Sequence, residues 1–460
     1  MTTAAALGYL EQTLEPGTGD IPAALLLGPV EGRAKALADA GLDRDRWREA
    51  RRRWIAEADR VTRAMVWLDG GADVAGITLG VKDTVDVAGM PTTLGHATHR
   101  HHPAADAAAV ARIRALGPAV IGKAYATELN IGAPGDVLNP AFPDLSPGGS
   151  STGSAVSVAA GICDFALSTD VLGSTRWPAT NCGIAGLRTT WHPGRLTGAL
   201  PVSPTQDALG LMARTVADLR RLWRRGPVVG AGPAGPEPGR IPRVATVANT
   251  RGCAPVLAEG VARTAAALAE LGVLCREVEL PDDLWSARAH AWELCAIDVA
   301  EVVEQVEARL TLRISPVARA SLGPEPASGR RAELLDAQAR FRSGLLAFLD
   351  REGIDMLLMP VSSTPPKRVA ERAGRPTLPK PDDADYADRL GYTPIASFAG
   401  LPALVQPAAV DPAHGPVGAQ LVGRPDQEAA LLALGARLEH LLGAVPVIAE
   451  RVARTLRDAR

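Results

Sequence analysis

Stretches of apolar and polar positions predict strands and helices in turn along most of the chain. Short apolar runs at 77–81, 119–122 and 165–167 predict buried strands. Before the last of these lie residues 154–160, where nearly every side chain is small. This pattern predicts a helix packed closely against its neighbours rather than an amphipathic surface helix. A helical pattern at 104–115 ends before a Gly-Pro pair.

The second half of the chain continues this alternation. Residues 243–247 and 273–280 predict strands on either side of a helix at 256–271, which is the pattern of a β-α-β unit. Two long helical patterns and one further strand follow, at 285–312, 331–352 and 355–360.

Residues 1–65 differ from the rest of the chain. They predict an N-terminal helical segment with a Pro/Gly turn at 15–17, and residues 46–60 are so charged that one helix face must be in solvent. A Gly/Pro-rich connector at 226–240 is too poor in apolar periodicity to pack. We therefore divide the chain into the segment 1–65 and one domain over 66–460 that contains the connector.

The composition limits the class of protein and its environment. The chain has 460 residues, 47% of them hydrophobic, and a net charge of −2, which describes a soluble globular protein with a large core. The near-neutral charge, without interleaved basic and aromatic residues, argues against nucleic acid as a partner. Five widely spaced cysteines, no basic leader and no apolar run of ~18 residues indicate a reduced compartment without a membrane span. We therefore expect a cytoplasmic protein.

Two glycine-rich loops carry serines that could act as nucleophiles. The first, residues 148–154, reads GGSSTGS, and the second places Ser174 beside Gly173 just past a predicted strand. A serine needs a base within hydrogen-bond reach, and the histidines show no matching context. Lys82, at the end of the 77–81 run, is the alternative, because burial can lower its pKa from ~10.4 toward neutrality.

Several of these motifs resemble those of the amidase signature family. Residues 148–189 contain GGSSTGSA, FAL-x-TD, GS-x-R-x-PA and CGIAGL, and VKDTVD at 81–86 resembles the family's lysine motif. Ser150 and Ser174 stand 24 residues apart, the separation that this family shows. The resemblance runs from about residue 70 to the end of the chain. It implies one large α/β domain with a central mixed β-sheet covered by helices on both faces, and no metal or cofactor.

The resemblance also implies a role for each candidate residue. The family uses a Ser–cis-Ser–Lys triad, in which Ser174 would be the nucleophile, Ser150 the proton relay behind a cis peptide bond, and Lys82 the base. Backbone N–H groups of the second loop would form the oxyanion hole, and neighbouring side chains would support the triad. The residues of the oxyanion hole would be Val171, Leu172, Gly173 and Ser174. The supporting residues would be Ser151, Thr169, Asp170 and Arg176, with Asp170 and Arg176 as a structural ion pair.

Two features depart from this pattern. Leu172 stands where the family has glycine or another small residue, and we expect it to narrow the pocket for a compact acyl group rather than weaken the oxyanion hole. Four histidines gather in one loop without Cys or Glu at ligand spacing, which favours a solvated loop over a metal site. These are His96, His99, His101 and His102.

The sequence therefore predicts hydrolysis of the C–N bond of a small-molecule amide through an acyl-enzyme. Four alternatives stay open: an amide-forming acyltransferase on the same triad, a hydrolase of urea-derived carboxylates such as allophanate, the A subunit of a tRNA-dependent amidotransferase, and a catalytically silent relative that acts as a binding or scaffold protein. The intact triad argues against the last. A homodimer is kept as an option for the assembly.

Overall fold

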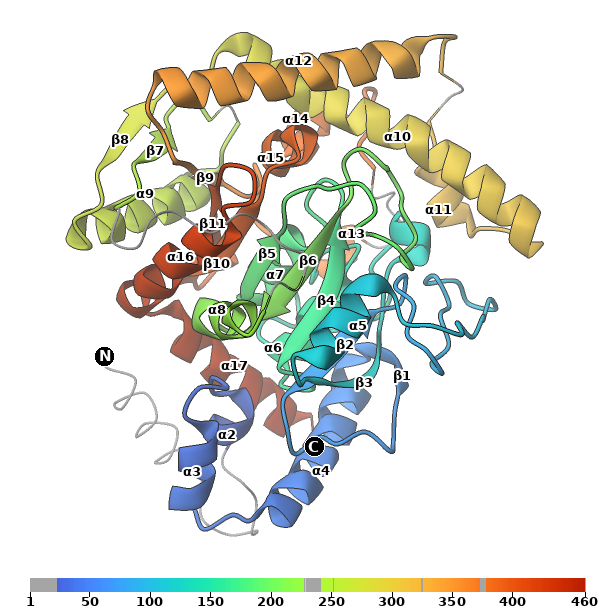
Figure 1. Ribbon diagram of the computed structural model, residues 1–460, viewed down its shortest axis with the longest axis vertical. Coiled ribbons are helices and arrows are strands. Elements are labelled where there is room, and N and C mark those ends of the chain that lie inside the picture. Colours follow the sequence, from blue (N-terminus) through green and yellow to red (C-terminus); the bar gives the residue numbers. More distant parts are fainter. Residues whose placement is uncertain are drawn as a thin grey trace.

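The computed structural model describes residues 23–226, 228, 241–250, 252–323, 326–372 and 378–459. One sheet of eleven strands runs through this structure, and helices cover it (Figure 1). The strands are β1 Met65–Leu68, β2 Thr78–Lys82, β3 Ala119–Ala124, β4 Phe165–Asp170, β5 Ala185–Arg188, β6 Ala208–Ala213, β7 Val244–Val247, β8 Cys275–Val278, β9 Met356–Pro360, β10 Ala403–Asp411 and β11 Gly415–Val422.

The helices of the described residues differ widely in length. The longest, α10, covers Asp282–Leu310, and α12 covers Arg330–Arg351. The others are α2 Ala23–Leu27, α3 Arg33–Asp39, α4 Arg44–Thr62, α5 Ala108–Ala115, the 3-10 helix η1 Glu128–Asn130, α6 Thr152–Ala159, α7 Arg176–Cys182, α8 Val216–Arg224, α9 Pro255–Glu270, α11 Pro316–Ala320, α13 Val369–Arg372, α14 Tyr386–Leu390, α15 Thr393–Ala399, α16 Glu428–Leu442 and α17 Ala444–Asp458.

The sheet is mixed, with strand order β1-β3-β2-β4-β6-β5-β10-β11-β9-β7-β8. β2 is parallel to both neighbours, β3 and β4, whereas β6 is antiparallel to β4 and β5. The antiparallel pair β10 and β11 joins this half to β9, β7 and β8, and β7 is parallel to β8 and β9. The expected α/β fold with a central mixed sheet is therefore confirmed, as is the β-α-β unit that β7, α9 and β8 form.

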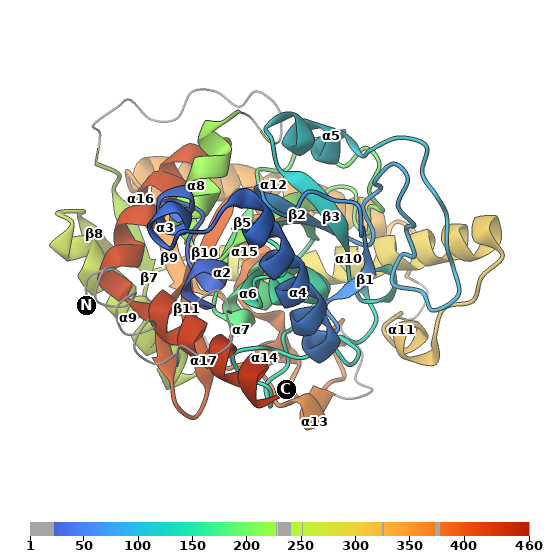
Figure 2. The same ribbon diagram turned by 90° about the horizontal axis from the view of Figure 1, so that it is seen from below.

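Alternate residues of the central strands enter two hydrophobic cores. In β4, Phe165 and Leu167 belong to one core and Ala166 to the other, because successive side chains of a strand point to opposite faces. Helices α5, α8, α9 and α16 cover the first core, and α4, α6, α7 and α17 cover the second. Figure 2 shows α4 and α17 in front of the strands when the molecule is seen from below. Helices therefore lie on both faces, as expected.

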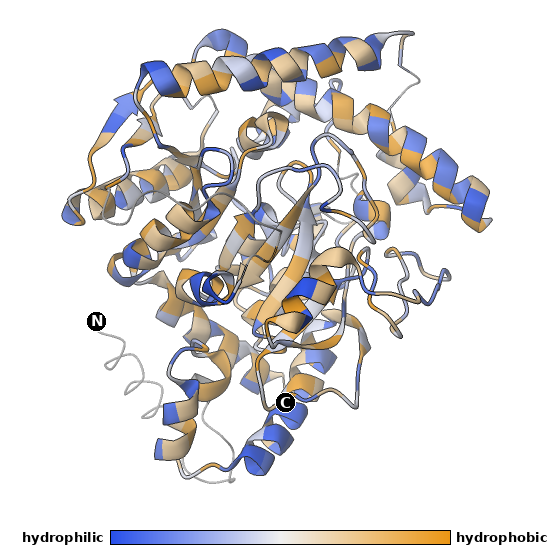
Figure 3. Cartoon of the chain, viewed as in Figure 1, coloured by the Kyte–Doolittle hydropathy of each residue, from blue (hydrophilic) through white to orange (hydrophobic). Residues whose placement is uncertain are grey.

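The charged N-terminal pattern forms a helix with one buried face. In α4 the buried positions Trp47, Arg51, Ile55 and Ala58 recur at helical spacing, and the turns facing outward are hydrophilic in Figure 3. Two buried arginines of this region, Arg33 and Arg51, contact the buried Asp164 carboxylate, which stands beside the start of β4. The segment is thus tied to the sheet by charge as well as by apolar packing. The turn expected at 15–17 lies outside the described residues.

Other expectations differ in detail. The helix predicted from residue 104 begins at Ala108, because the N–H groups of Ala107 and Ala108 bond to the carbonyls of Asp86 and Thr197 in neighbouring loops. Most of the connector at 226–240 lies outside the described residues. In the part of the chain that the structure describes, no single helix is long and apolar enough to cross a membrane; α16 and α17 pass such a test only as a pair bent by 71°.

A third apolar cluster lies at one end of the sheet, where α10 and α12 run side by side (Figure 1). It includes Trp292 of α10 and Tyr392 just before α15, and it continues to Val171 and Leu172 past the end of β4. This cluster therefore reaches the loop that carries Ser174.

Candidate active site

Lys82 is the last residue of β2, and its side chain is completely buried. Its Nζ forms hydrogen bonds with Ser150 Oγ at 2.8 Å and Thr169 Oγ1 at 2.9 Å. Because β2 and β4 are parallel neighbours, Lys82 and Thr169 lie at the same edge of the sheet.

The buried position changes the basicity of this lysine. Burial lowers the pKa of Lys82 to about 7, against the opposing effect of the Asp207 and Asp170 carboxylates. Burial also raises the pKa of Asp207 to about 6. Near pH 7 a large share of Lys82 is therefore neutral and able to accept a proton.

The first serine loop connects the lysine to the neighbouring segments. The Gly149–Ser150 peptide bond is cis, as the resemblance implied. Ser150 is buried, and besides its bond with the lysine its Oγ donates to Asn130 Oδ1 at 3.2 Å. Ser151 Oγ donates to the carbonyl of Thr169 at 3.3 Å. The loop is thus held against the ends of β2 and β4.

The helix that follows this loop consists of small residues for a steric reason. Every residue of α6 is buried, and a Cβ at Gly153 would lie 2.2 Å from the Ala64 carbonyl oxygen and 2.4 Å from the Tyr125 nitrogen. Only glycine permits this approach. The small side chains therefore bring the first serine loop close to β3.

Ser174 lies in the second loop, past the end of β4 at Asp170. The N–H of Ser151 donates to its carbonyl oxygen at 3.3 Å, so the two serine loops are in contact. Ser174 is partly exposed and lines a pocket, and its Oγ has no hydrogen bond to another described residue. The structure thus bonds Lys82 to Ser150 directly and leaves the Ser174 hydroxyl available to a ligand.

Asp170 shapes the second loop. Its carboxylate accepts the N–H groups of Gly173 at 2.9 Å and Thr175 at 3.2 Å, and it forms a buried ion pair with Arg176 at 2.8 Å. Burial alone would raise the pKa of Asp170, but Arg176 and Arg188 outweigh burial and hold that pKa well below its ordinary value. The expected ion pair is present and stays charged at neutral pH.

The backbone N–H groups of the second loop are not all available. Gly173 donates to Asp170 Oδ1, so one of the four donors implied by the resemblance is already engaged. The N–H groups of Val171, Leu172 and Ser174 have no hydrogen bond to another described residue. These three are the donors that could meet an oxyanion.

Leu172 keeps an ordinary backbone conformation. It is absent from the described residues with positive φ, whereas Gly173 has φ 128°. A Cβ at Gly173 would lie 2.7 Å from Thr393 Oγ1, so glycine is required at 173 and not at 172. The Leu172 side chain is buried and lines the pocket.

The pocket beside Ser174 is small, with a cavity volume of about 20 Å³, and its walls are mostly apolar. The rings of Trp177 and Trp292 stack with centroids 5.8 Å apart, and their indole N–H groups donate to backbone carbonyls. Both rings are therefore fixed, with their polar atoms satisfied. The remaining walls include Asn130, Ile131, Val202, Cys295 and Leu378.

Sequence reasoning identified Leu172 as a wall of the pocket, but not Trp292 or Leu378. Trp292 comes from α10 and Leu378 from the segment before α14, so no local motif connects either residue to Ser174. Asp207 was also missed; this buried carboxylate opposes the lowering of the Lys82 pKa.

Two histidines of the histidine loop bond to other segments of the chain. His96 Nε2 bonds to the Arg313 carbonyl at 2.9 Å, and His101 Nε2 to Asp86 at 3.0 Å. Within the described ranges, no group of three or more His, Cys, Asp or Glu side chains is placed to hold a metal ion.

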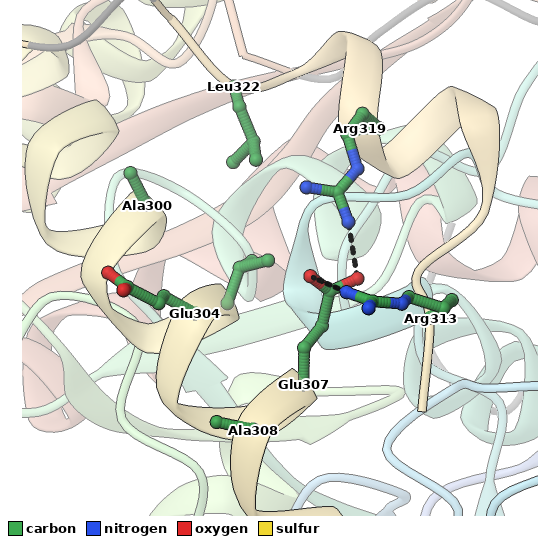
Figure 4. A pocket seen from close by; sticks show the side chains of 8 residues that line it. Ala300, Glu304, Glu307, Ala308, Arg313, Arg319 and Leu322 are labelled. Carbon is green, nitrogen blue, oxygen red and sulfur yellow. Dashed lines mark hydrogen bonds and ion pairs between the residues drawn. The ribbon is translucent and has the colours of Figure 1, made fainter. Parts of the chain in front are cut away.

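A second hollow lies between α10 and α11, away from the serine loops. Figure 4 shows Arg313 and Arg319 converging on Glu307, which also accepts the N–H of Ile314 at 3.0 Å. The charged groups at its centre thus pair with one another. They fix the segment that links α10 to α11.

Comparison with known proteins agrees with the geometry. The family model described as Amidase matches residues 50–229 and 234–432. AmiB2 of Mycobacterium tuberculosis, a protein assigned as an amidase, is 32% identical over 402 residues, which cover 81% of this chain and 83% of the relative. Indoleacetamide hydrolase of Pseudomonas savastanoi is 41% identical over 155 residues, 32% of this chain and 34% of that protein.

A solved structure described as an amidase has a TM-score of 0.74 and 27% identity, covering 88% of this chain and 98% of that one. The family match extends over most of the chain, and the fold agrees over nearly the whole of the solved structure. The chain therefore belongs to the amidase family, and it is an enzyme of the class that hydrolyses carbon–nitrogen bonds.

Proposed function

We propose that the protein hydrolyses the amide of a compact, flat carboxylic acid through an ester formed on Ser174. One observation carries this proposal: the buried hydrogen bond of 2.8 Å between Lys82 and Ser150, in a loop that contacts the Ser174 loop. A lysine whose pKa is near 7 can act as a general base, and a hydroxyl between base and nucleophile can relay the proton.

In this mechanism Ser174 Oγ attacks the amide carbonyl carbon as its proton passes to Ser150 Oγ and the Ser150 proton passes to Lys82 Nζ. The Ser150 hydroxyl, which donates to Asn130 Oδ1 at rest, must first turn its proton toward the lysine. The proton returns by the same route to the amide nitrogen, the C–N bond breaks, and the amine leaves. Water then attacks the ester with the same relay, which releases the acid and restores Ser174.

The negative oxygen formed in each step needs donors in place beforehand. The unengaged N–H groups of Val171, Leu172 and Ser174 supply candidates, and removal of one such donor costs roughly 2.7–4 kcal/mol in other enzymes. Asp170 and Arg176 support this loop without touching the substrate in the proposed mechanism.

The walls of the pocket favour a compact acyl group with a flat apolar part. Trp177 and Trp292 offer carbon surfaces with satisfied N–H groups, and Leu172 and Val202 add aliphatic contacts. The name of one relative, indoleacetamide hydrolase, suggests an amide of this kind, an arylacetamide.

A panel of aryl, alkyl and urea-derived amides, with and without added amines, tests the proposal by mass spectrometry of the products. Turnover of allophanate alone, or acyl transfer in preference to hydrolysis, would replace it by the corresponding alternative.

The pH dependence of the rate follows from the state of Lys82. The protonated amine cannot accept a proton, and burial places its pKa at about 7. We expect kcat/KM to rise about tenfold per pH unit below this value and to level off above it. A stopped assay from pH 5 to 9, with circular dichroism at each pH, checks this. A rate that falls steadily from pH 6 to 9 in folded protein would rule out a lysine base.

Leu172→Gly tests what the leucine does in the pocket. Because its backbone is ordinary and its side chain lines the pocket, we expect broader acceptance of bulky acyl groups. The kcat on the best small amide should rise less than tenfold, since pocket size discriminates at ~1–3 kcal/mol per methylene. Kinetics on a series of acyl chain lengths gives the answer. A uniform gain of about a hundredfold on all substrates would show instead that Leu172 impairs the oxyanion hole.

A further inference from the structure

The side chain of Asn130 has one bonded end and one unbonded end at the pocket. Its Oδ1 accepts the Ser150 hydroxyl at 3.2 Å, whereas its Nδ2 is buried and has no hydrogen-bond partner among the described residues. Asn130 lines the pocket that Ser174 lines. A buried amide donor without a partner carries a cost in stability, so a group that supplies the missing acceptor would be bound favourably.

The turn that carries Asn130 is held in place from outside. The Glu128 carboxylate accepts the N–H of Ser315 at 3.0 Å, and Ser321 Oγ donates to the carbonyl of Ile131 at 3.0 Å. Both serines flank α11, in the region braced by the Glu307 ion pairs (Figure 4). The carboxamide is therefore presented by a fixed turn.

Backbone conformation alone does not account for an asparagine here. Asn130 has φ 65°, a region in which asparagine is favoured over most residues. However, the preceding Leu129 has φ 45° in the same turn, so this turn accommodates a residue without a carboxamide. The conformation explains why asparagine is tolerated at position 130. It does not explain why a carboxamide with an unpartnered donor lies there.

We infer that Asn130 determines specificity by donating from Nδ2 to an oxygen of the acyl group near the scissile carbonyl. This inference rests on the proposed function and narrows its substrates. The Trp177 and Trp292 rings would contact a flat apolar group, and Asn130 would select acids that carry a carbonyl oxygen on a carbon close to the amide. Within the proposed substrates, amides of flat, compact acids that carry an oxo group are thus preferred over amides of the corresponding acids without it.

Binding measured in the Ser174→Ala background tests this without depending on turnover. Calorimetry would compare two pairs of amides that differ only by C=O against CH2: 2-oxo-2-phenylacetamide with phenylacetamide, and 3-oxo-3-phenylpropanamide with 3-phenylpropanamide. We expect the oxo member of at least one pair to bind about tenfold more tightly, which is the range for one neutral hydrogen bond to an otherwise unsatisfied donor. Equal affinities within both pairs would overturn the inference.

Two further substitutions in this background assign the preference to the donor. Asn130→Gly retains access to the left-handed conformation and removes the carboxamide, whereas Asn130→Asp keeps the shape and replaces the NH2 with oxygen. Both should reduce the preference to less than threefold. Leu378→Ala, at the same pocket, should change the affinity for both members of a pair equally and so preserve the ratio. A preference that survives in Asn130→Gly, or disappears equally in Leu378→Ala, would overturn the inference.

The kinetics of the protein with Ser174 intact separate this inference from the proposed function. Hydrolysis of all four amides at equal kcat/KM would leave the amidase proposal standing and contradict the role of Asn130. An oxo preference in binding, with no hydrolysis of any amide and no acyl-enzyme, would support Asn130 as a recognition residue and contradict the proposed reaction.

Discussion

Ser174→Ala is expected to lower kcat/KM for amides by on the order of 10⁴-fold or more. The hydroxyl forms the ester bond in the proposed mechanism, so its removal abolishes the covalent route rather than weakening it. No neighbouring thiol can substitute, because burial raises the pKa of the pocket residue Cys295 well above its ordinary value, and the thiolate is the reactive form. The residual rate should reflect binding and the oxyanion donors alone.

The measurement combines steady-state kinetics with labelling by a serine-directed phosphonate. Ser154→Ala is the control, because this serine lies in the first loop, is completely buried, and its Oγ has no hydrogen-bond partner among the described residues. That variant should keep the labelling and most of the activity. Single-site labelling that persists in Ser174→Ala would show that the nucleophile is another residue.

The elements that carry Lys82, Ser150 and Ser174 could be predicted from the sequence because each depends on local pattern. Apolar runs bounded by Gly and Pro gave β2, β3 and β4, and the run of small residues gave α6, since these residues are buried on all sides. The glycine at 173 marks a real steric need, with φ 128°. Lys82 followed from its place at the end of a buried strand, and burial lowers its pKa in the structure for the reason expected from that place.

The walls of the pocket could not be predicted in this way. Trp292 and Leu378 reach Ser174 only because α10 and the segment before α14 fold back over the end of the sheet. The hydrogen bond from the Gly173 N–H to Asp170 also depends on the tertiary structure. It reduces the number of candidate oxyanion donors from four to three. The sequence did not indicate that the Asn130 side chain has an unpartnered donor, because this can be recognised only once the positions of all neighbouring acceptors are known.

The second large effect is expected from Lys82→Met, which removes the proposed base but retains a side chain of similar length in a fully buried position. We expect kcat/KM to fall by about 10³-fold or more, and Ser150→Ala to lose activity to a similar degree, because members of a relay act as a unit. The rise in rate through pH 7 should also disappear, since its source is the lowered pKa of Lys82.

Lys123→Met is the matched control, because Lys123 is a second buried lysine, in the adjacent strand β3 and opposite Val81 in the register. Its Nζ bonds to Thr92 Oγ1 at 2.7 Å and faces Asp83 at 3.5 Å, so it plays no part in the proposed relay. This substitution should lower the free energy of unfolding by about 3 kcal/mol, because a buried carboxylate loses a partner. The folded fraction should still react with the phosphonate at Ser174 and retain the pH dependence. If both variants lost activity equally while folded, or if Lys82→Met kept the rise through pH 7, buried lysines would matter here for packing, and the base would have to be sought elsewhere.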